Sequence, residues 1–220
     1  MTTPVKVDIW SDVQCPWCFI GKRKFEAGVL QFGGPVEIEY HSFELSPDTP
    51  VDFEGTTIDY LADRKGMARD DVTRMLAHVT TIARGVGLSY DFENVHQTNT
   101  GKAHELLHFA KAHGVQAEVK ERLLSAYFEQ GRHLGQVDEL VAIAGDAGLD
   151  ANAARTALAE GTYRKDVEAD IAQAAAYGIS GVPFFVLNGK FGVSGAQSSE
   201  VFASALSEAA ADQTSSHSDA

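Results

Sequence analysis

Two cysteines, Cys15 and Cys18, are the residues of this sequence best suited to chemistry, and they stand in one Cys-Pro-Trp-Cys motif. A disulfide that stabilises a fold usually closes a longer loop, because a longer loop restricts the unfolded chain more. Two intervening residues suit either thiol–disulfide exchange or one half of a zinc site. A zinc site would need two more ligands at comparable spacing, and the sequence has no second cysteine pair and only scattered histidines. We therefore predict a redox-active dithiol and no metal.

The segment around this motif has the pattern of a β-α-β unit. Residues 5–10 and 36–43 alternate apolar and polar side chains and are rich in strand formers. Between them, Pro16 suits the first turn of a helix, and apolar residues recur at helical spacing until Gly33-Gly34-Pro35. The motif would lie at a helix N-terminus, where free N–H groups and partial positive charge favour a thiolate. We expect Cys15 to be the nucleophile and Cys18, one turn later and more buried, to be the resolving thiol.

The pattern changes after residue 48 and changes back after residue 178. The intervening sequence has helical periodicity and almost no strand pattern. It predicts helices over 58–65, 70–84, 98–113, 119–128, 137–147, 151–160 and 163–177. A strand, a tight turn, a partner strand and a last helix follow at 182–187, Asn188-Gly189, 190–194 and 199–210.

The order of these elements predicts an α/β protein with a thioredoxin-like fold, in which a large all-helical insertion separates a β-α-β half from a β-β-α half. Residues 1–48 and 179–211 would form a discontinuous thioredoxin-like domain. Residues 49–178 would form the helical insertion, and residues 212–220 a flexible polar tail. We expect the insertion to pack over the edge of the active site and to influence substrate choice.

Composition excludes several classes of function. A formal net charge of −13 repels phosphate backbones and anionic lipids, so we expect no nucleic acid and no membrane among the partners. No stretch is apolar over the length that a membrane span needs. The first residues lack the basic start and apolar run of a signal peptide, so a cytoplasmic location is expected.

The sequence from Ser11 to Cys18, with Ile20-Gly21-Lys22 after it, resembles the DsbA-like thiol–disulfide oxidoreductases, most of all their cytoplasmic FrnE-like branch. This resemblance implies a cis Val182–Pro183 peptide that faces the dithiol and leaves the Val182 backbone free for an extended peptide. The residues alone leave a trans proline at the start of a strand equally open. On the resemblance, the expected substrate contacts are Pro16, Trp17, Val182 and Pro183. Further matches, reaching to about residue 210, lie at Phe43-Glu44-Leu45, Ala103-His104, Ala126-Tyr127-Phe128, Gly178-Ile179, Gly181–Phe185 and Gly195-Ala196-Gln197.

The motif departs from periplasmic DsbA, which has a histidine where Trp17 stands. A tryptophan offers an N–H donor but no charge, so we expect the pKa of Cys15 to lie between those of the DsbA and thioredoxin nucleophiles. The bases at 22–24 would add positive potential or form a solvated face. Glu44 is a candidate proton relay for Cys18, or else a surface residue that ends a strand. His104 is expected to be structural, and Asn99 and Thr100 to cap a helix.

The leading function is exchange of disulfides with protein or small-molecule substrates. It needs no cofactor beyond the redox-active disulfide, with glutathione as a candidate co-substrate. The alternative is a glutathione-dependent isomerase or transferase of the kappa-class or 2-hydroxychromene-2-carboxylate isomerase type. Such proteins share the plan but typically carry a lone serine or similar residue where Cys15 stands. A third reading is a binding module or chaperone that does not use its thiols. The oligomeric state and the net direction of exchange stay open.

Overall fold

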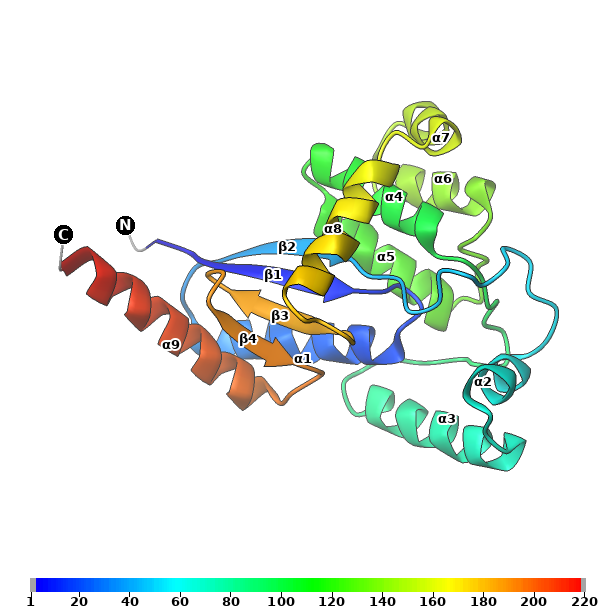
Figure 1. Ribbon diagram of the computed structural model, residues 1–220, viewed down its shortest axis with the longest axis horizontal. Helices are drawn as coiled ribbons and strands as arrows, with labels where there is room; N and C mark the ends of the chain where they lie inside the picture. The colour runs from blue at the N-terminus through cyan, green and yellow to red at the C-terminus, as the bar shows by residue number, and fades with distance from the viewer. Residues whose placement is uncertain (1–2, 219–220) are drawn as a thin grey trace.

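The computed structural model describes residues 3–218, with a four-stranded sheet at its centre in the order β2-β1-β3-β4 (Figure 1). The strands are β1 (Val5–Ser11), β2 (Val36–Ser42), β3 (Phe184–Leu187) and β4 (Phe191–Ser194). β1 runs parallel to β2 and antiparallel to β3, and β3 pairs antiparallel with β4. Ile9 in the central strand lies opposite Tyr40 on one side and Phe185 on the other. The two halves separated in the sequence therefore share one sheet, as predicted.

Helices make up much of the remaining chain. They are α1 (Pro16–Phe32), α2 (Thr57–Lys65), α3 (Arg69–Arg84), α4 (Gly101–Ala112), α5 (Gln116–Phe128), α6 (Val137–Asp146), α7 (Ala151–Glu160), α8 (Arg164–Ala176) and α9 (Ser199–Ser218). Local capping fixes several starts: Thr56 and Asp59 form a capping box before α2, and Asp150 caps α7 as predicted. Each helix predicted from periodicity is present, and its bounds differ by a few residues except at the C-terminal end of α9.

Helices cover both faces of the sheet. On one face α1 and α9 pack against each other, and the rings of Phe25, Phe185 and Phe202 lie 4.6–5.4 Å apart between centroids. On the other face, Trp10 packs with Ala174 of α8. Successive residues of a strand point to opposite faces, so β1 contributes Ile9 to the first layer and Trp10 to the second. The sheet face that carries Ile9 thereby packs against Phe25 in the later turns of α1.

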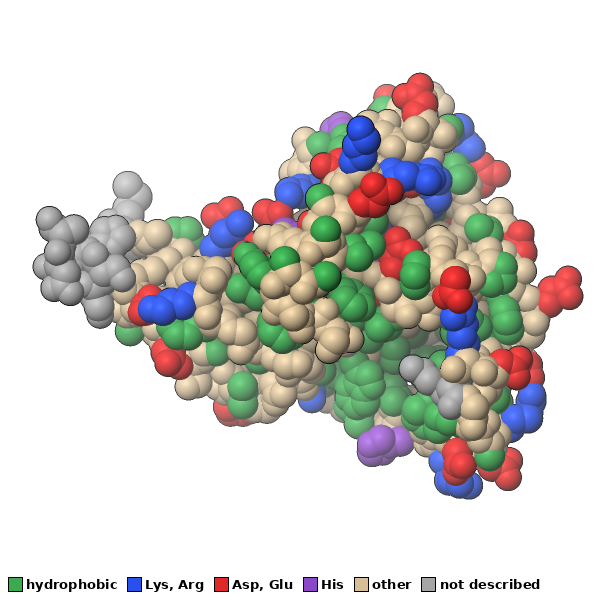
Figure 2. Space-filling model, in the orientation of Figure 1, with side chains coloured by type: hydrophobic (Ala, Val, Ile, Leu, Met, Phe, Trp, Pro, Cys, Tyr) green, Lys and Arg blue, Asp and Glu red, His purple; other side chains and the backbone are tan. Residues whose placement is uncertain are grey.

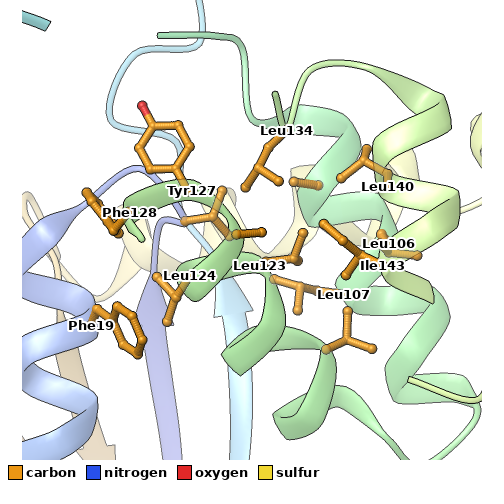
Figure 3. Packing of buried hydrophobic residues seen from close by; sticks show 14 of the residues in the cluster. Phe19, Leu106, Leu107, Leu123, Leu124, Tyr127, Phe128, Leu134, Leu140 and Ile143 are labelled. Atoms are coloured by element: carbon orange, nitrogen blue, oxygen red, sulfur yellow. The ribbon is translucent and has the colours of Figure 1, made fainter. Parts of the chain in front are cut away.

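The largest hydrophobic core joins α1 to the helical segment. Figure 3 shows Phe19 of α1 beside Leu124 and Phe128 of α5, with Leu106 and Ile143 farther into the same cluster. All five side chains are buried. The first turns of α1 therefore pack on the helical segment, whereas its later turns pack on the sheet. The division of the chain into domains stays a prediction, and this core is continuous across the predicted boundary.

The C-terminal helix is longer than predicted. Residues 212–218, expected to form a flexible tail, continue α9, and residues 219–220 lie outside the described residues. The reason is contact with the β3–β4 turn: the Asn188 side chain donates to the Ala209 carbonyl at 3.0 Å, and Lys190 pairs with Asp212 at 2.5 Å. Neither α9 nor any other described helix combines the length and the apolar character that a membrane crossing requires.

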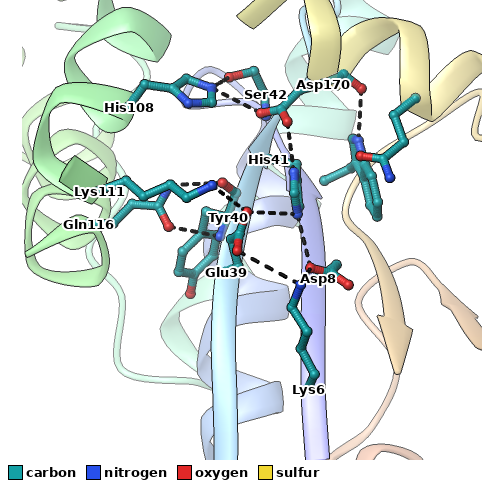
Figure 4. A network of polar contacts seen from close by, with 12 residues as sticks. Lys6, Asp8, Glu39, Tyr40, His41, Ser42, His108, Lys111, Gln116 and Asp170 are labelled. Atoms are coloured by element: carbon teal, nitrogen blue, oxygen red, sulfur yellow. Dashed lines mark hydrogen bonds and ion pairs between the residues drawn. The ribbon is translucent and has the colours of Figure 1, made fainter. Parts of the chain in front are cut away.

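A buried polar cluster fastens the helices to the edge of the sheet; we call it the histidine cluster, and it consists of Asp8, His41, Ser42, His108 and Asp170 (Figure 4). The Asp170 carboxylate of α8 lies 2.8 Å from His41 Nδ1 and 3.0 Å from His108 Nε2, and it accepts the Ser42 backbone N–H at 2.7 Å. The other ring nitrogen of His41 lies 3.1 Å from Asp8. The cluster therefore ties β1, β2, α4 and α8 together.

Charge in this cluster follows from its hydrogen bonds. Burial lowers the pKa of His41, but the bonds to Asp170 and Asp8 outweigh burial and raise it to about 9. Burial raises the pKa of Asp170, but His108 and His41 outweigh it, so that this pKa lies well below its usual range. His41 and Asp170 therefore form an ionised pair at neutral pH.

Candidate active site

A buried carboxylate shapes the loop between β1 and the dithiol. Asp12 Oδ2 accepts the Leu45 backbone N–H at 2.8 Å and the Gln14 side-chain N–H at 3.1 Å. Its Oδ1 lies 3.3 Å from His104 Nε2 of α4. Burial raises the pKa of Asp12, but the hydrogen bond and charge of His104 outweigh burial and lower it. The loop is thus anchored both to the segment after β2 and to the helical segment.

The two cysteines lie at the start of α1, as predicted. Cys15 is the N-cap residue, Pro16 occupies the first turn, and the Cys18 backbone N–H donates to the Cys15 carbonyl at 3.0 Å. Their exposed fractions are 4% and 3%, so the expected difference in burial is absent. Both are free thiols in this structure. Cys15 Sγ points to the Val182 carbonyl oxygen, 3.5 Å away.

The loop before β3 lies over the start of α1. The Val182–Pro183 peptide is cis, as the sequence resemblance implies. The Gly195 backbone N–H donates to the Pro183 carbonyl at 2.8 Å, which holds the loop from the β4 side. On the α1 side, a Cβ atom at Gly21 would come within 2.9 Å of Pro183 Cγ. A glycine at this position therefore allows the loop to approach the helix closely.

The electrostatic surroundings of the two thiols differ. The hydrogen bond shared with Cys18, together with burial, raises the pKa of Cys15 well above its ordinary value. Burial also raises the pKa of Cys18, but the bond from Cys15, the charge of Lys120 and the bond from Ser11 lower it overall. In this conformation the pKa of Cys15 is raised, contrary to the expected intermediate value, and the pKa of Cys18 is lowered.

The bases after the motif have hydrogen-bond and ion-pair partners of their own. Lys22 pairs with Glu26 at 2.5 Å and with Glu121 at 2.6 Å, and Arg23 binds the same two carboxylates. Lys24 donates to the Ala196 carbonyl at 3.1 Å. The charges of Lys22 and Arg23 are therefore compensated by the carboxylates of Glu26 and Glu121.

An apolar cavity of about 350 Å³ lies beside the motif. Trp17 is 37% exposed and lines it with Pro16, and the Tyr90 hydroxyl fixes this turn by donating to the Pro16 carbonyl at 2.7 Å. The opposite wall comes from α2 and α3, with Tyr60 and Met75 among its residues. Figure 2 shows hydrophobic side chains gathered in a hollow above α3. A substrate bound at the motif can reach this cavity.

Glu44, predicted as a candidate relay, lines a different cavity, with Lys102, Glu105 and Arg164. Burial raises the pKa of Glu44. Within residues 3–218 no hydrogen bond joins it to either cysteine, and its relay role stays a prediction.

The remaining predicted polar residues lie on α4 or just before it. Asn99 accepts the Gly101 backbone N–H at 2.9 Å, as a cap would, whereas Thr100 makes no side-chain cap bond. His104 is fully buried against Asp12, but its Nδ1 has no partner among the described residues. It is therefore less completely bonded than a structural histidine is expected to be.

Sequence reasoning missed two residues of this site, Asp12 and Lys120. Lys120 of α5 is 1% exposed, and its charge acts on Cys18. A lysine in an amphipathic helix usually belongs to the solvated face. Its spacing is the available signal, because Gln116, Lys120 and Leu124 share one face of the helix and the last is apolar.

Among the residues that the structure describes, Asp8, Glu39 and His41 form one group that could hold a metal ion, with ligand atoms within 4.8 Å of one another. Lys6 lies 3.3 Å from Asp8, and Lys111 lies 2.5 Å from Glu39. These ammonium groups already compensate the carboxylates, and we assign no metal to the group.

Comparison with known proteins gives consistent matches. The family model described as DSBA-like thioredoxin domain matches residues 6–207. The uncharacterized protein YwbO of Bacillus subtilis (strain 168) is 30% identical over 210 residues, which cover 93% of this chain and 96% of that protein. The probable DsbA oxidoreductase SCO1869 from Streptomyces coelicolor is 37% identical with a TM-score of 0.88, over 93% of this chain and 89% of that one.

Two more distant structures share the fold at 16% identity. One is 2-hydroxychromene-2-carboxylate isomerase, with a TM-score of 0.69 over 97% of this chain and 98% of that one. The other is the cytosolic disulfide reductase DsbM from Pseudomonas aeruginosa, with a TM-score of 0.60 over 98% and 100%. Together these matches confirm the predicted α/β, thioredoxin-like fold class and its large helical content.

Proposed function

The chain belongs to the DSBA-like thioredoxin domain family, and from this premise we propose that it exchanges disulfides with its substrates through Cys15 and Cys18. The observation that carries the proposal is the position of Cys15: it caps α1, and its sulfur lies 3.5 Å from the carbonyl oxygen of Val182 beside a cis proline. A substrate that pairs with the Val182 backbone would hold its own sulfur close to this thiol.

The reaction has two steps. The Cys15 thiolate attacks one sulfur of a substrate disulfide, forms a mixed disulfide and releases the other sulfur as a thiolate. Cys18, as a thiolate, then attacks the Cys15 sulfur, closes the Cys15–Cys18 disulfide and releases the second substrate thiolate. Two electrons pass from the protein to the substrate. The reverse sequence oxidises a substrate dithiol.

Deprotonation of Cys15 fits the surroundings of the pair. The two thiols share a hydrogen bond that raises the pKa of Cys15 and lowers the pKa of Cys18. The Cys18 thiolate can accept the proton of Cys15 as that sulfur attacks. It then passes the proton to the released substrate thiolate and is a thiolate again for the second step. The remaining contacts to substrate come from Pro16, Trp17 and the cis-proline loop, and the cavity beside Trp17 receives an apolar group of the substrate.

We place this exchange in the cytoplasm, with protein or small thiols as substrates and glutathione as a candidate co-substrate. Both cysteines belong to the motif and none is left for a structural disulfide, which suits a reducing compartment where disulfides are transient and catalytic. The cytosolic disulfide reductase DsbM, a structure of the same fold, has been crystallised with glutathione. Assignment to the FrnE-like branch is part of the same proposal.

The test is reduction of a disulfide-linked fluorescent peptide by the purified protein with glutathione present. We expect Cys15→Ser to lower the rate by about 10³-fold or more, because it removes the nucleophile. Cys18→Ser is the matched variant: it keeps the nucleophile but should accumulate the mixed disulfide, visible by mass spectrometry as protein plus half of the peptide. Unchanged exchange in Cys15→Ser contradicts the proposal.

A second candidate is a glutathione-dependent isomerase, favoured by the fold shared with 2-hydroxychromene-2-carboxylate isomerase and by the apolar cavity beside the motif. Such an activity needs no second cysteine. Isomerisation of an aromatic carboxylate that survives Cys18→Ser, together with no dithiol exchange in the wild type, would select this candidate.

A further inference from the structure

Lys120 is a buried cation without a hydrogen bond. It lies on α5 with 1% of its surface exposed, and its Nζ has no hydrogen-bond partner among the described residues. The Lys120 Nζ lies over the ring of Tyr40, 5.7 Å from the ring centroid. An ammonium group placed in a protein interior without a partner is costly, so a compensating charge must lie near it.

The neighbouring backbone fixes this lysine in place. Gln116, one turn earlier on α5, accepts the Tyr40 backbone N–H at 2.9 Å and donates to the Tyr40 carbonyl at 2.8 Å. These two bonds join α5 to β2 and hold the face of α5 that carries Lys120 against the sheet. Burial lowers the pKa of Lys120 below its ordinary value, and Cys18, Asp12 and Cys15 offset this only in part.

Cys18 is the group acting on Lys120 whose charge depends on redox state, because its thiol can ionise and a disulfide cannot. The Asp12 carboxylate is already bound by Leu45, Gln14 and His104. Conversely, Lys120 is the strongest charge that favours ionisation of Cys18. The two side chains come from different parts of the fold, Cys18 from the first turn of α1 and Lys120 from α5.

We propose that the Lys120 ammonium is the counter-charge of the Cys18 thiolate and that it shifts the dithiol–disulfide equilibrium toward the dithiol. This inference rests on the proposed thiol–disulfide exchange. The thiolate exists only in the reduced protein, because Cys18 becomes uncharged when the disulfide closes. Oxidation therefore leaves Lys120 buried without its counter-charge, which disfavours the disulfide.

The redox step balances with glutathione as the reductant. Two glutathione thiols supply two electrons and two protons to the Cys15–Cys18 disulfide and become glutathione disulfide. One proton stays on Cys15, and the other is released from Cys18, whose thiolate remains beside Lys120. Reduction of the disulfide thus creates a thiolate at Cys18, which the Lys120 ammonium can stabilise. Lys120 acts through Cys18 and is a positioning residue.

The experiment equilibrates full-length protein with mixtures of reduced and oxidised glutathione and measures the oxidised fraction by thiol trapping. We expect Lys120→Met to shift the equilibrium constant toward the disulfide by at least about tenfold, which is about 30 mV for two electrons. Lys120→Arg keeps the charge and should stay near the wild type. Lys111→Met is the matched control, because it removes the same charge from an exposed lysine of α4 that pairs with Glu39.

A second readout does not depend on exchange. In a Cys15→Ser background, the ultraviolet absorbance of the thiolate is followed against pH. Lys120→Met should raise the pKa of Cys18 by about one unit or more, because it removes a nearby positive charge. The ionisable groups that act on Cys18 or Lys120 from the surrounding elements are Asp12, Cys15, Lys22, Tyr40 and Tyr90. All except Cys15 are retained in each variant compared.

The outcomes separate the two proposals. Equal equilibrium constants for wild type and Lys120→Met, or equal shifts for Lys120→Met and Lys111→Met, overturn the role of Lys120 and leave the exchange activity standing. No reversible transition in the wild type overturns the proposed function. In that case the Cys18 titration alone decides whether Lys120 faces a thiolate. A denaturant unfolding curve for each variant confirms that it is folded.

Discussion

Two buried polar clusters lie on this sheet, and they differ in how completely their polar atoms are bonded. The histidine cluster uses both ring nitrogens of His41, and Asp170 is bound by two histidines and a backbone N–H. The second, which we call the dithiol cluster, consists of Asp12, Cys15, Cys18, His104 and Lys120. In it, the Nδ1 of His104 and the Nζ of Lys120 have no partner among the described residues.

We interpret this difference as a difference in role: the histidine cluster stabilises the fold, and the dithiol cluster serves the redox chemistry. Buried polar groups in native proteins are nearly always bonded, so an exception calls for a reason. No such exception is found among the residues of the histidine cluster, which joins helices to the edge of the sheet. In the dithiol cluster, the charge that compensates Lys120 changes with the redox state of Cys18, so a permanent partner would cancel its effect. We therefore expect substitutions in the first cluster to change the free energy of unfolding and those in the second to change the redox equilibrium.

The largest stability effect is expected at Asp170. Asp170→Ala removes the partner of two buried histidines and should lower the free energy of unfolding by about 3 kcal/mol, because it leaves a buried charge uncompensated. Urea unfolding measures the change. Glu168→Ala, on an exposed position of the same helix, should change stability by about 0.5 kcal/mol or less. Equal effects of the two variants would remove the distinction between the clusters.

The pH dependence of stability should report His41. Its pKa is raised from an ordinary value near 6.5 to about 9 in the folded protein, so its contribution is fully present below pH 6.5 and is lost as the pH rises through 9. The difference in unfolding free energy between wild type and His41→Gln should therefore shrink by about 2–3 kcal/mol across that interval. A difference that is constant with pH means that folding does not change the pKa of His41, which would contradict the ionised pair.

Close packing at the dithiol cluster can be tested at Gly21. Gly21→Ala places a Cβ atom 2.9 Å from Pro183 Cγ, so the cis-proline loop must shift, at a cost of about 1–2 kcal/mol. Peptide exchange should slow as well, because Val182 moves with the loop. Gly145→Ala in α6 is the control: nothing lies within 4 Å of its Cβ, and replacing a helical glycine should stabilise the fold by about 0.5–1 kcal/mol. Slowed exchange in both variants contradicts the account.

The smallest stability effect is expected at Lys120. Lys120→Met replaces an unbonded buried cation by an apolar side chain of similar length, so the unfolding free energy should change by about 1 kcal/mol or less, or increase. Chemical denaturation of the reduced protein measures it. A loss as large as that of Asp170→Ala would mean that Lys120 is part of the structural framework, like the histidine cluster.

Much of the fold was predictable because periodicity reports which residues are buried. The strands, the helices and the position of Cys15 and Cys18 at a helix start all followed from local pattern. The extension of α9 did not, because it depends on Asn188 and Lys190, residues distant in sequence from the end of the helix. The same holds for the bases after the motif, whose partner Glu121 belongs to α5.

The site was predictable in its sulfur atoms but not in its electrostatics. A Cys-X-X-Cys motif before a helix specifies where the thiols lie, whereas the groups that control their ionisation come from other elements. Lys120 belongs to a helix whose contact with the dithiol depends on tertiary packing. Its position on the buried face of α5 was the signal, since a charged residue in an apolar stripe is rarely buried without a function.

The central claim is that Cys15 and Cys18 form a reversible redox pair. Equilibration of the wild type with glutathione redox buffers, followed by thiol trapping and mass spectrometry, tests it directly. The account predicts a single two-electron transition in which both cysteines are protected from alkylation together and which is absent in Cys15→Ser. Two thiols that remain alkylated independently in every buffer would contradict it.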